Sequence, residues 1–258
     1  MKGLVNGWLC CVVAVLVVAA GAQADVFNMG GIRDANGTWT GLASLETVHV
    51  GDPGNVGEFS GKGVDGTGRN NCGAVAYEYN IGKYEVTAGQ YAEFLNAVAK
   101  TDTYGLYNPW MAVVPTFPWG CNIQRTGSSG SYTYSVPIDR ANRPVNNVCY
   151  WDACRFTNWL SNGQPTGAQG PGTTETGTYT LNGYDGNDGR SIQRNADAKW
   201  AVTSEDEWYK AAYYKGGSTN AGYWDYRTSC READGDARWA TAGHDAMGAR
   251  WHVPRKVY

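Results

Sequence analysis

The sequence predicts an α+β fold, a single irregular domain rich in glycine and tryptophan. One segment alternates apolar and polar residues as a half-buried strand does, and three others pair helix-capping residues with apolar residues at helical spacing. Glycine supplies 35 of 258 residues, close to twice its usual share of about 7%. Such a chain is expected to form short elements joined by glycine turns and covered by its 11 Trp and 17 Tyr side chains.

The first 24 residues are expected to form a secretory signal peptide. A basic start at Lys2 precedes an unbroken apolar run from Leu9 to Ala20, and small residues lead to a cleavage site after Ala24. This run is shorter than the roughly 20 residues that a membrane-spanning helix needs. A signal anchor is the alternative. The mature chain is therefore predicted to be secreted or extracytoplasmic, with no membrane span after signal removal.

The strand signals come next along the chain. Residues 25–75 are predicted to be a lead-in of loops and short strands, because they hold clusters of Gly, Asp, Pro and Asn that favour turns. Residues 73–86 are expected to form a half-buried strand. There Val75, Tyr77, Tyr79 and Ile81 fall on one side and polar residues on the other.

The first predicted helix begins at Thr87, which forms a capping-box pattern with Gln90. The apolar residues behind this start recur at the spacing of one helix face. They are Tyr91, Phe94, Leu95 and Val98.

Two more helices are expected. The second begins near residues 151–152, runs to Asn162 and stops at Gly163. The third begins at Thr203 or Ser204, with acidic residues in its first turn, where the helix dipole favours negative charge. Residues 163–195, between these helices, are expected to form a long loop with one short strand at residues 179–181.

Charge and cysteine content limit the partners and the chemistry. Charged residues make up 17% of the chain and its net charge is −3, so nucleic acid is not an expected partner. The chain has three His residues, and the mature part contains no C-x-x-C motif. Neither a His-rich metal site nor a zinc knuckle is predicted. Five cysteines follow the signal: Cys72, Cys121, Cys149, Cys154 and Cys230.

An odd number of cysteines permits two disulfides and one thiol, or fewer bridges and more thiols. A bridge between Cys72 and Cys121 is one alternative, and the sequence leaves the pairing open.

Four groups of residues then occur in order between residues 76 and 226, and together they resemble the formylglycine-generating enzyme (sulfatase-modifying factor) family. They are Ile81–Thr87 with Gln90–Tyr91 and Phe94–Asn96; Arg143–Val145 with Val148–Ala153 and Phe156–Trp159; Trp200–Trp208 with Ala211–Ala212; and Gly222–Tyr226. The resemblance implies a compact α+β domain related in shape to C-type lectins. It also implies an activity, the copper- and oxygen-dependent oxidation of a sulfatase cysteine to formylglycine, with calcium for structure. Two cysteine thiolates hold the copper in active members, and soft ligands suit Cu(I).

The departures from the family pattern are as informative as the matches. The family's last third carries the copper cysteines, a G-N-V-W-E-W calcium segment, an R-G-G-S-W string and a closing G-F-R, and none of these strings occurs here. Thr157 stands where the family has a structural cysteine. We therefore interpret residues 76–226 as an incomplete domain and residues 227–258 as an unmatched tail, with a frameshift or truncation after about Tyr226 as the hypothesis. No catalytic, cofactor-binding or metal-binding residue is carried over.

Other candidate sites are better explained structurally. Cys149 and Cys154 are five positions apart at a helix start, so a shared copper ion is less expected than separate thiols. The acidic run Asp185–Gly189 lacks the full calcium-loop frame and is interpreted as a solvated turn, as is Asp234–Asp236.

Glu205, Asp206 and Glu207 are interpreted as first-turn acids of a helix, not as the paired carboxylates of a glycoside hydrolase. His244, Asp245 and His252 lie in the unmatched tail and are not expected to form a ligand cluster.

The sequence thus favours a secreted sulfatase-modifying-factor-like protein that is catalytically inactive as written and needs no cofactor. The alternative is a non-catalytic extracellular module that binds a glycan or a cell-surface protein, as its export and its aromatic content suggest. A third alternative, an oxidase of another substrate, would need metal ligands that the sequence does not reveal.

Overall fold

The computed structural model describes residues 29, 31–59, 71–113, 118–217, 219 and 221–224. The elements within these residues are short and mix helices with strands, in agreement with the predicted α+β class. In chain order they are β1 (Ile32–Arg33), β2 (Trp39–Thr40), β3 (Thr47–Val50), β4 (Tyr79–Gly82), α1 (Ala88–Val98), the 3₁₀ helix η1 (Pro109–Met111), β5 (Gln124–Thr126), β6 (Thr133–Ser135), α2 (Ile138–Ala141), α3 (Tyr150–Ser161) and α4 (Glu205–Tyr213).

The described strands form three separate antiparallel pairs, β1–β2, β3–β4 and β5–β6. The strand expected within residues 73–86 is reduced to β4, so its predicted extent was wrong. Its partner β3 is only four residues long, and the ladder ends where β3 ends. Before β4, Val75 donates its amide to the Asn55 side chain, 3.2 Å away, instead of to a neighbouring strand.

Helix α1 begins as the sequence predicts. Thr87 accepts a hydrogen bond from the amide of Gln90 at 3.2 Å, and the Gln90 side chain accepts one from the amide of Thr87 at 3.0 Å. The four apolar residues predicted to share one face are all buried, with Phe94 and Leu95 fully so. Local capping and apolar spacing were therefore sufficient to define this helix.

The two later helices also follow their start signals. Helix α4 begins after Ser204, whose side chain accepts from the amide of Glu207 at 3.1 Å. Helix α3 begins one or two residues earlier than expected, because Cys149 acts as its N-cap with Asp152 as the capping-box partner. At the far end of α3, Gly163 has a positive φ of 81°, as the predicted stop requires.

The strand expected at residues 179–181 is absent: these residues form no β-ladder. Tyr179 and Leu181 are buried in a small cluster with Cys154, whereas Thr180 is exposed. The amide of Tyr179 is satisfied by the Asn158 side chain at 2.7 Å and that of Leu181 by the carbonyl of Glu175 at 2.8 Å. One side chain of α3 and a backbone carbonyl of the loop thus replace a partner strand.

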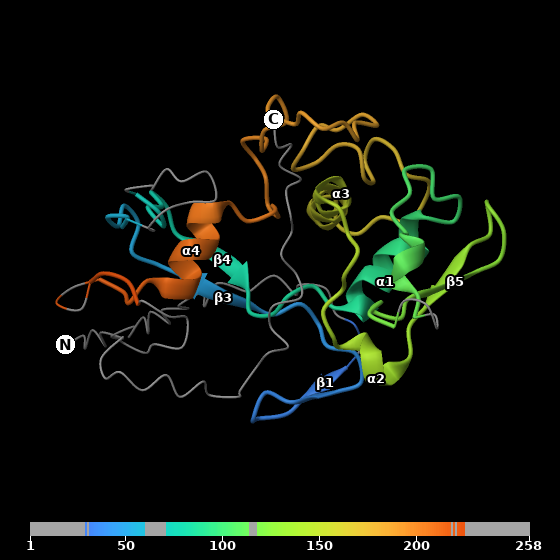
Figure 1. Ribbon diagram of the computed structural model, residues 1–258, viewed down its shortest axis with the longest axis horizontal. Coiled ribbons are helices and arrows are strands. Elements are labelled where there is room, and N and C mark those ends of the chain that lie inside the picture. The colour runs from blue at the N-terminus through green and yellow to red at the C-terminus, as the bar shows by residue number, and fades with distance from the viewer. Residues whose placement is uncertain are drawn as a thin grey trace, which may run out of the picture.

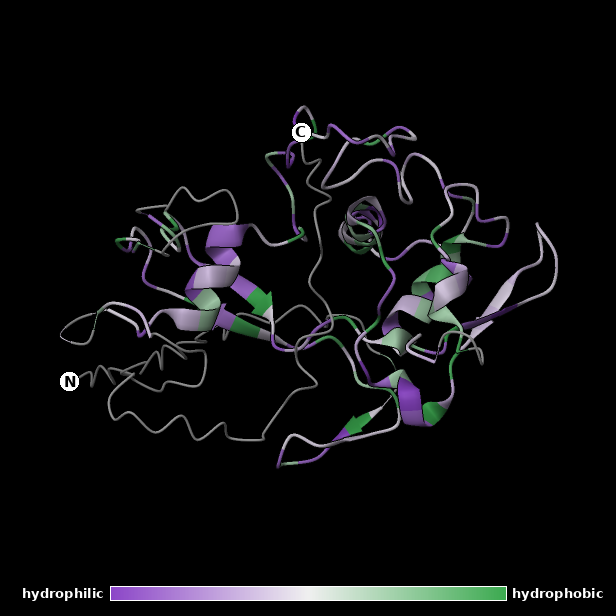
Figure 2. Cartoon of the chain, viewed as in Figure 1, coloured by the Kyte–Doolittle hydropathy of each residue, from purple (hydrophilic) through white to green (hydrophobic). Residues whose placement is uncertain are grey.

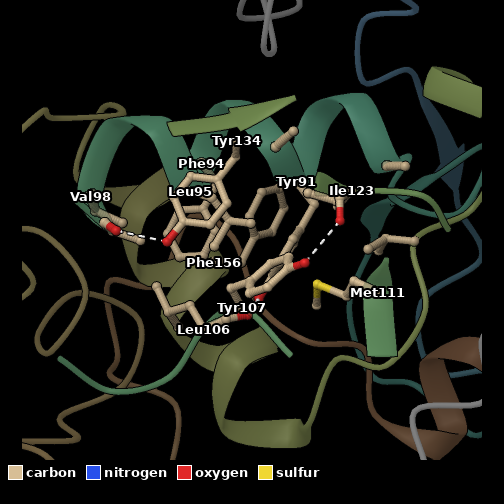
Figure 3. Packing of buried hydrophobic residues seen from close by; sticks show 14 of the residues in the cluster. Tyr91, Phe94, Leu95, Val98, Leu106, Tyr107, Met111, Ile123, Tyr134 and Phe156 are labelled. Atoms are coloured by element: carbon tan, nitrogen blue, oxygen red, sulfur yellow. Dashed lines mark hydrogen bonds between the residues drawn. The ribbon is translucent and has the colours of Figure 1, made fainter. Parts of the chain in front are cut away.

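An aromatic core lies between α1, α3 and the segments that follow α1 (Figure 3). The Phe94 ring meets Phe156 edge-to-face at 5.3 Å between ring centroids, and Trp159 at 5.2 Å. Three tyrosine hydroxyls donate to backbone carbonyls inside this core: Tyr91 to Leu106 at 2.9 Å, Tyr134 to Ala99 at 2.8 Å and Tyr107 to Ile123 at 3.2 Å. The core is thus built from apolar ring faces, and the hydroxyl groups inside it have hydrogen-bond partners.

The elements gather in two halves (Figure 1). One half holds β3, β4 and α4, and the other holds α1, α2, α3 and the β5–β6 hairpin. Hydropathy colouring shows apolar residues along α1 and in the β3–β4 pair, whereas α4 begins with a hydrophilic turn (Figure 2). Among the described residues, no helix is long and apolar enough to cross a membrane.

Candidate functional site

A groove with a volume of about 1140 Å³ lies between the two halves of the molecule. We call it the central groove. Its walls come from β3 and β4, the start of α1, the inner face of α3, and α4 with the segment before it. Residues lining it include Glu46, Val48, Ile81, Lys83, Gln90, Phe156, Leu160, Trp200, Trp208 and Lys210. Two of its aromatic residues are open to solvent, Tyr84 at 60% and Trp208 at 44% exposure.

On one wall of the groove, Glu46 is held by three partners. The Trp39 indole donates to its carboxylate at 2.7 Å, and Arg33 and Lys83 lie 3.2 Å and 3.7 Å away. Burial raises the pKa of Glu46, but the hydrogen bond from Trp39 and the two cations outweigh burial and lower it. A carboxyl group kept ionised in this way is not suited to act as a general acid near neutral pH.

Another lining residue, Lys210 on α4, is almost fully buried, at 1% exposure. Its ammonium group donates to the carbonyl of Asp52 at 2.7 Å and lies 5.7 Å from the centre of the Tyr214 ring. Burial lowers the pKa of Lys210, and the nearby Asp52 and Glu78 partly oppose this shift. Because the ammonium is directed at a backbone carbonyl, the contact ties α4 to the segment after β3.

The acidic start of α4 has structural roles, as the sequence suggested. Glu207 forms a bidentate pair with Arg194 at 2.6 Å and 2.7 Å, and also accepts from the hydroxyl of Tyr77 at 2.6 Å and the amide of Ser204 at 2.7 Å. Burial raises the pKa of Glu207, but these hydrogen bonds dominate and lower it to about 2. Asp206 accepts from the amide of Gly73 at 3.0 Å.

The acidic run 185–189 lies at the surface. Asp185 and Asp188 are exposed, and Asp188 lies 3.6 Å from Arg190. The hydroxyl of Tyr184 donates to the backbone carbonyl of Asp188. In the described part of the chain, no three His, Cys, Asp or Glu side chains come close enough to hold a metal ion together. The residues of the second acidic run, 234–236, and His244, Asp245 and His252 lie outside the described residues.

The cysteines of the described residues lie in different surroundings. Cys121, Cys149 and Cys154 carry free thiols, so the bridge considered between Cys72 and Cys121 is not formed. Cys121 lies in the aromatic core, whereas Cys72 pairs with Glu58 in an isolated bridge elsewhere. Burial raises the pKa of the Cys121 thiol, and raises that of Cys154 to about 12.

Cys149 differs from the others because the residue is exposed. Desolvation by its neighbours, followed by the Asp152 carboxylate, raises the pKa of its thiol to about 11. Its sulfur accepts from the amide of Asp152 at 3.4 Å, which makes it a helix cap.

Thr157, where the family has a structural cysteine, is buried and donates to the carbonyl of Cys154 at 2.9 Å. Cys230 lies outside the described residues.

Sequence reasoning missed the central groove altogether. Its walls come from five separate stretches of chain between residues 39 and 216, and no local pattern marks any of them as part of a groove. The strings that carried the family resemblance do contribute to it, among them residues 81–87 and 200–203. Those strings could have indicated where the groove lies once their positions in the fold were known.

Comparison with known proteins bears on the family. The chain matches the family model described as the sulfatase-modifying factor enzyme 1-like domain over residues 57–253. This range contains all four groups of residues that carried the resemblance and continues past Tyr226, so the likeness reaches into the segment that those groups left unmatched. The frameshift hypothesis for that segment stays a prediction. No curated protein and no solved structure matches the chain. Because the family model covers more than half of the sequence, this chain belongs to the sulfatase-modifying factor (FGE-sulfatase) family.

Proposed function

We propose that this protein is a secreted, non-catalytic member of the sulfatase-modifying factor family. The observation that supports the absence of catalysis is the placement of the cysteines. In the described residues, the thiols of Cys121 and Cys154 are buried in separate apolar clusters, and Cys149 caps a helix. The signal-like sequence of residues 1–24 supports export.

Two titratable groups of the central groove support the same proposal. Glu46 is held by Trp39 and two cations, and Lys210 by a backbone carbonyl. A catalytic acid, base or nucleophile has to be within reach of a substrate and in a useful protonation state. These two groups instead join segments of the fold.

The test is an activity assay on the purified chain from residue 25 to 258. We would incubate it with a cysteine-containing sulfatase peptide, oxygen and added copper, and follow conversion of the thiol to an aldehyde by mass spectrometry. An active family member serves as the positive control, and near-UV circular dichroism establishes that the tested chain is folded. We expect no conversion above that in peptide alone. Oxygen-dependent aldehyde formation would overturn the proposal.

A second function, binding of an extracellular glycan, is favoured by one specific observation. Tryptophan side chains lie open to solvent outside the central groove, at Trp110 with 52% and Trp119 with 75% exposure. Exposed aromatic surface on a secreted protein often marks a binding site. The C-type-lectin-like shape implied by the family supports the same choice. Retention of the chain by a polysaccharide is the direct test, and its complete absence would count against this function.

A further inference from the structure

The exposed residues Trp110 and Trp119 lie close together in the fold, although nine positions separate them. Gly120, next to Trp119, is packed against the carbonyl groups of η1. A Cβ atom added to Gly120 would come within 2.7 Å of the carbonyl oxygen of Trp110 and 2.6 Å of that of Met111. The amide of Asn122 also donates to the Met111 carbonyl at 2.7 Å. The backbone at Gly120, next to Trp119, therefore packs against the backbone of Trp110.

Two neighbouring asparagines hold these backbones in place. The Asn147 side chain donates to the carbonyl of Trp110 at 3.0 Å, and the Asn146 side chain donates to the carbonyl of Trp119 at 2.7 Å. The Asn146 oxygen in turn accepts from Asn147 at 3.0 Å and from the amide of Cys121 at 2.9 Å. Both tryptophans are thus fixed at their main chain, which reduces the entropy lost when a ligand orders such a surface.

The two segments that carry the pair and its asparagines contain no charged residue. No Asp, Glu, Lys or Arg occurs in residues 107–124 or in residues 144–149. A nucleic acid or an anionic membrane surface would need Lys or Arg here. The available chemistry is two large aromatic rings with side-chain amides beside them. This combination matches a ligand with apolar faces and neutral hydrogen-bonding groups.

We propose that the surface formed by Trp110, Trp119, Asn146 and Asn147 binds a neutral oligosaccharide. This inference rests on the second proposed function, and it specifies both the site and the ligand class. The C–H faces of the sugar rings pack on the two indoles, and their hydroxyl groups meet the polar atoms at the edge of the surface. Gly120 contributes by allowing the two tryptophan backbones to approach each other.

The experiment compares wild-type protein (residues 25–258) with Trp110→Ala and Trp119→Ala on immobilised neutral polysaccharides and on a neutral oligosaccharide array. Trp208→Ala is the matched control, because Trp208 is also an exposed tryptophan but lies on α4 in the central groove. We expect each of the first two variants to lose at least tenfold in affinity and Trp208→Ala to bind as wild type does. Trp119→Phe, which keeps an aromatic ring, should retain part of the binding.

The results distinguish failure of the proposed binding site from failure of the glycan-binding function. If wild type binds and all variants bind equally well, the site is overturned while glycan binding stands. If folded wild type binds no neutral glycan, both fail. If it binds vesicles or proteins but not sugars, the ligand class is wrong. Circular dichroism of each variant identifies any loss of glycan binding that is caused by misfolding. If Trp119→Ala misfolds, Trp119→Phe is compared with wild type in its place.

Discussion

At the residue scale, buried charges hold together parts of this protein that have little regular structure. Arg155 and Glu175 are each 1% exposed and pair at 2.7 Å, and the amide of Gly183 also donates to Glu175, at 2.6 Å. Arg194 and Glu207 form the second such pair, between the long loop and α4. Each carboxylate also accepts a backbone amide, so the cost of removing these charges from water is offset by several hydrogen bonds.

Stability should depend on pH through Glu207. Its pKa falls from 4.5 to about 2 on folding, so its contribution is fully present above about pH 4.5 and is lost as pH falls toward 2. A difference of this size corresponds to about 3 kcal/mol. Glu207→Gln should therefore lower the free energy of unfolding at pH 7 and reduce its change between pH 5 and pH 3, as measured by urea denaturation.

The control for this prediction is Glu93→Gln, because Glu93 is an exposed glutamate on α1. This variant should keep the stability of the wild type at pH 7. An equal pH dependence in Glu207→Gln and wild type would show that the Arg194 pair does not contribute as argued.

At the scale of elements, the three longest helices all begin with a reciprocal capping box, at Thr87, Cys149 and Ser204. Cysteine is the exception, because its sulfur is a weak hydrogen-bond acceptor. The helix thus keeps the geometry of the box with a poorer cap.

Replacing this cap should stabilise the protein. We expect Cys149→Ser to raise the free energy of unfolding by a few tenths to about 1 kcal/mol, because serine is among the preferred N-cap residues. Cys149→Ala, which has no acceptor, should lower it. Thermal and urea unfolding of the two variants form a matched test. If the serine variant is less stable than the alanine variant, the capping role is wrong.

Helices and strands differed in how far they could be predicted. A capping box and an apolar face are encoded within about a dozen neighbouring residues, so α1, α3 and α4 were found from the sequence. The strand β4 depends on β3, some thirty positions earlier, and its length is set by that partner. At residues 179–181 no strand formed, because Asn158 on α3 bonds to the backbone of Tyr179 where a neighbouring strand would.

At the scale of the whole molecule, the long loop after α3 is held down by polar side chains of that helix. Asn158 bonds to the carbonyls of Thr174 and Tyr179 at 2.7 Å and 2.9 Å, and Arg155 bonds to Glu175 and to the carbonyl of Tyr184 at 3.1 Å. Arg155 also lies 4.6 Å from the centre of the Tyr104 ring. The fold of the loop therefore depends on a few buried groups.

Breaking the Arg155–Glu175 pair should release this loop. Glu175→Gln leaves a buried arginine without its counter-charge and should cost about 3–5 kcal/mol, as measured by denaturation. Limited proteolysis should then cut within residues 163–195 faster than in wild type. Asp139→Asn is the control, since it breaks an exposed pair with Arg140 that is worth little. Unchanged proteolysis in Glu175→Gln would contradict this account of the loop.

The sequence by itself determined the family, the three main helices with their caps, and the structural role of the acids at the start of α4. All of these depend on residues that are close neighbours in the chain or on short strings in a fixed order. The tertiary structure alone decided the strand pairs, the central groove and the burial of the cysteine thiols. It also decided that the backbone segments carrying Trp110 and Trp119 pack against each other. These depend on contacts between distant segments, and the energy of such contacts comes from burial and from completed hydrogen bonds, which no local pattern records.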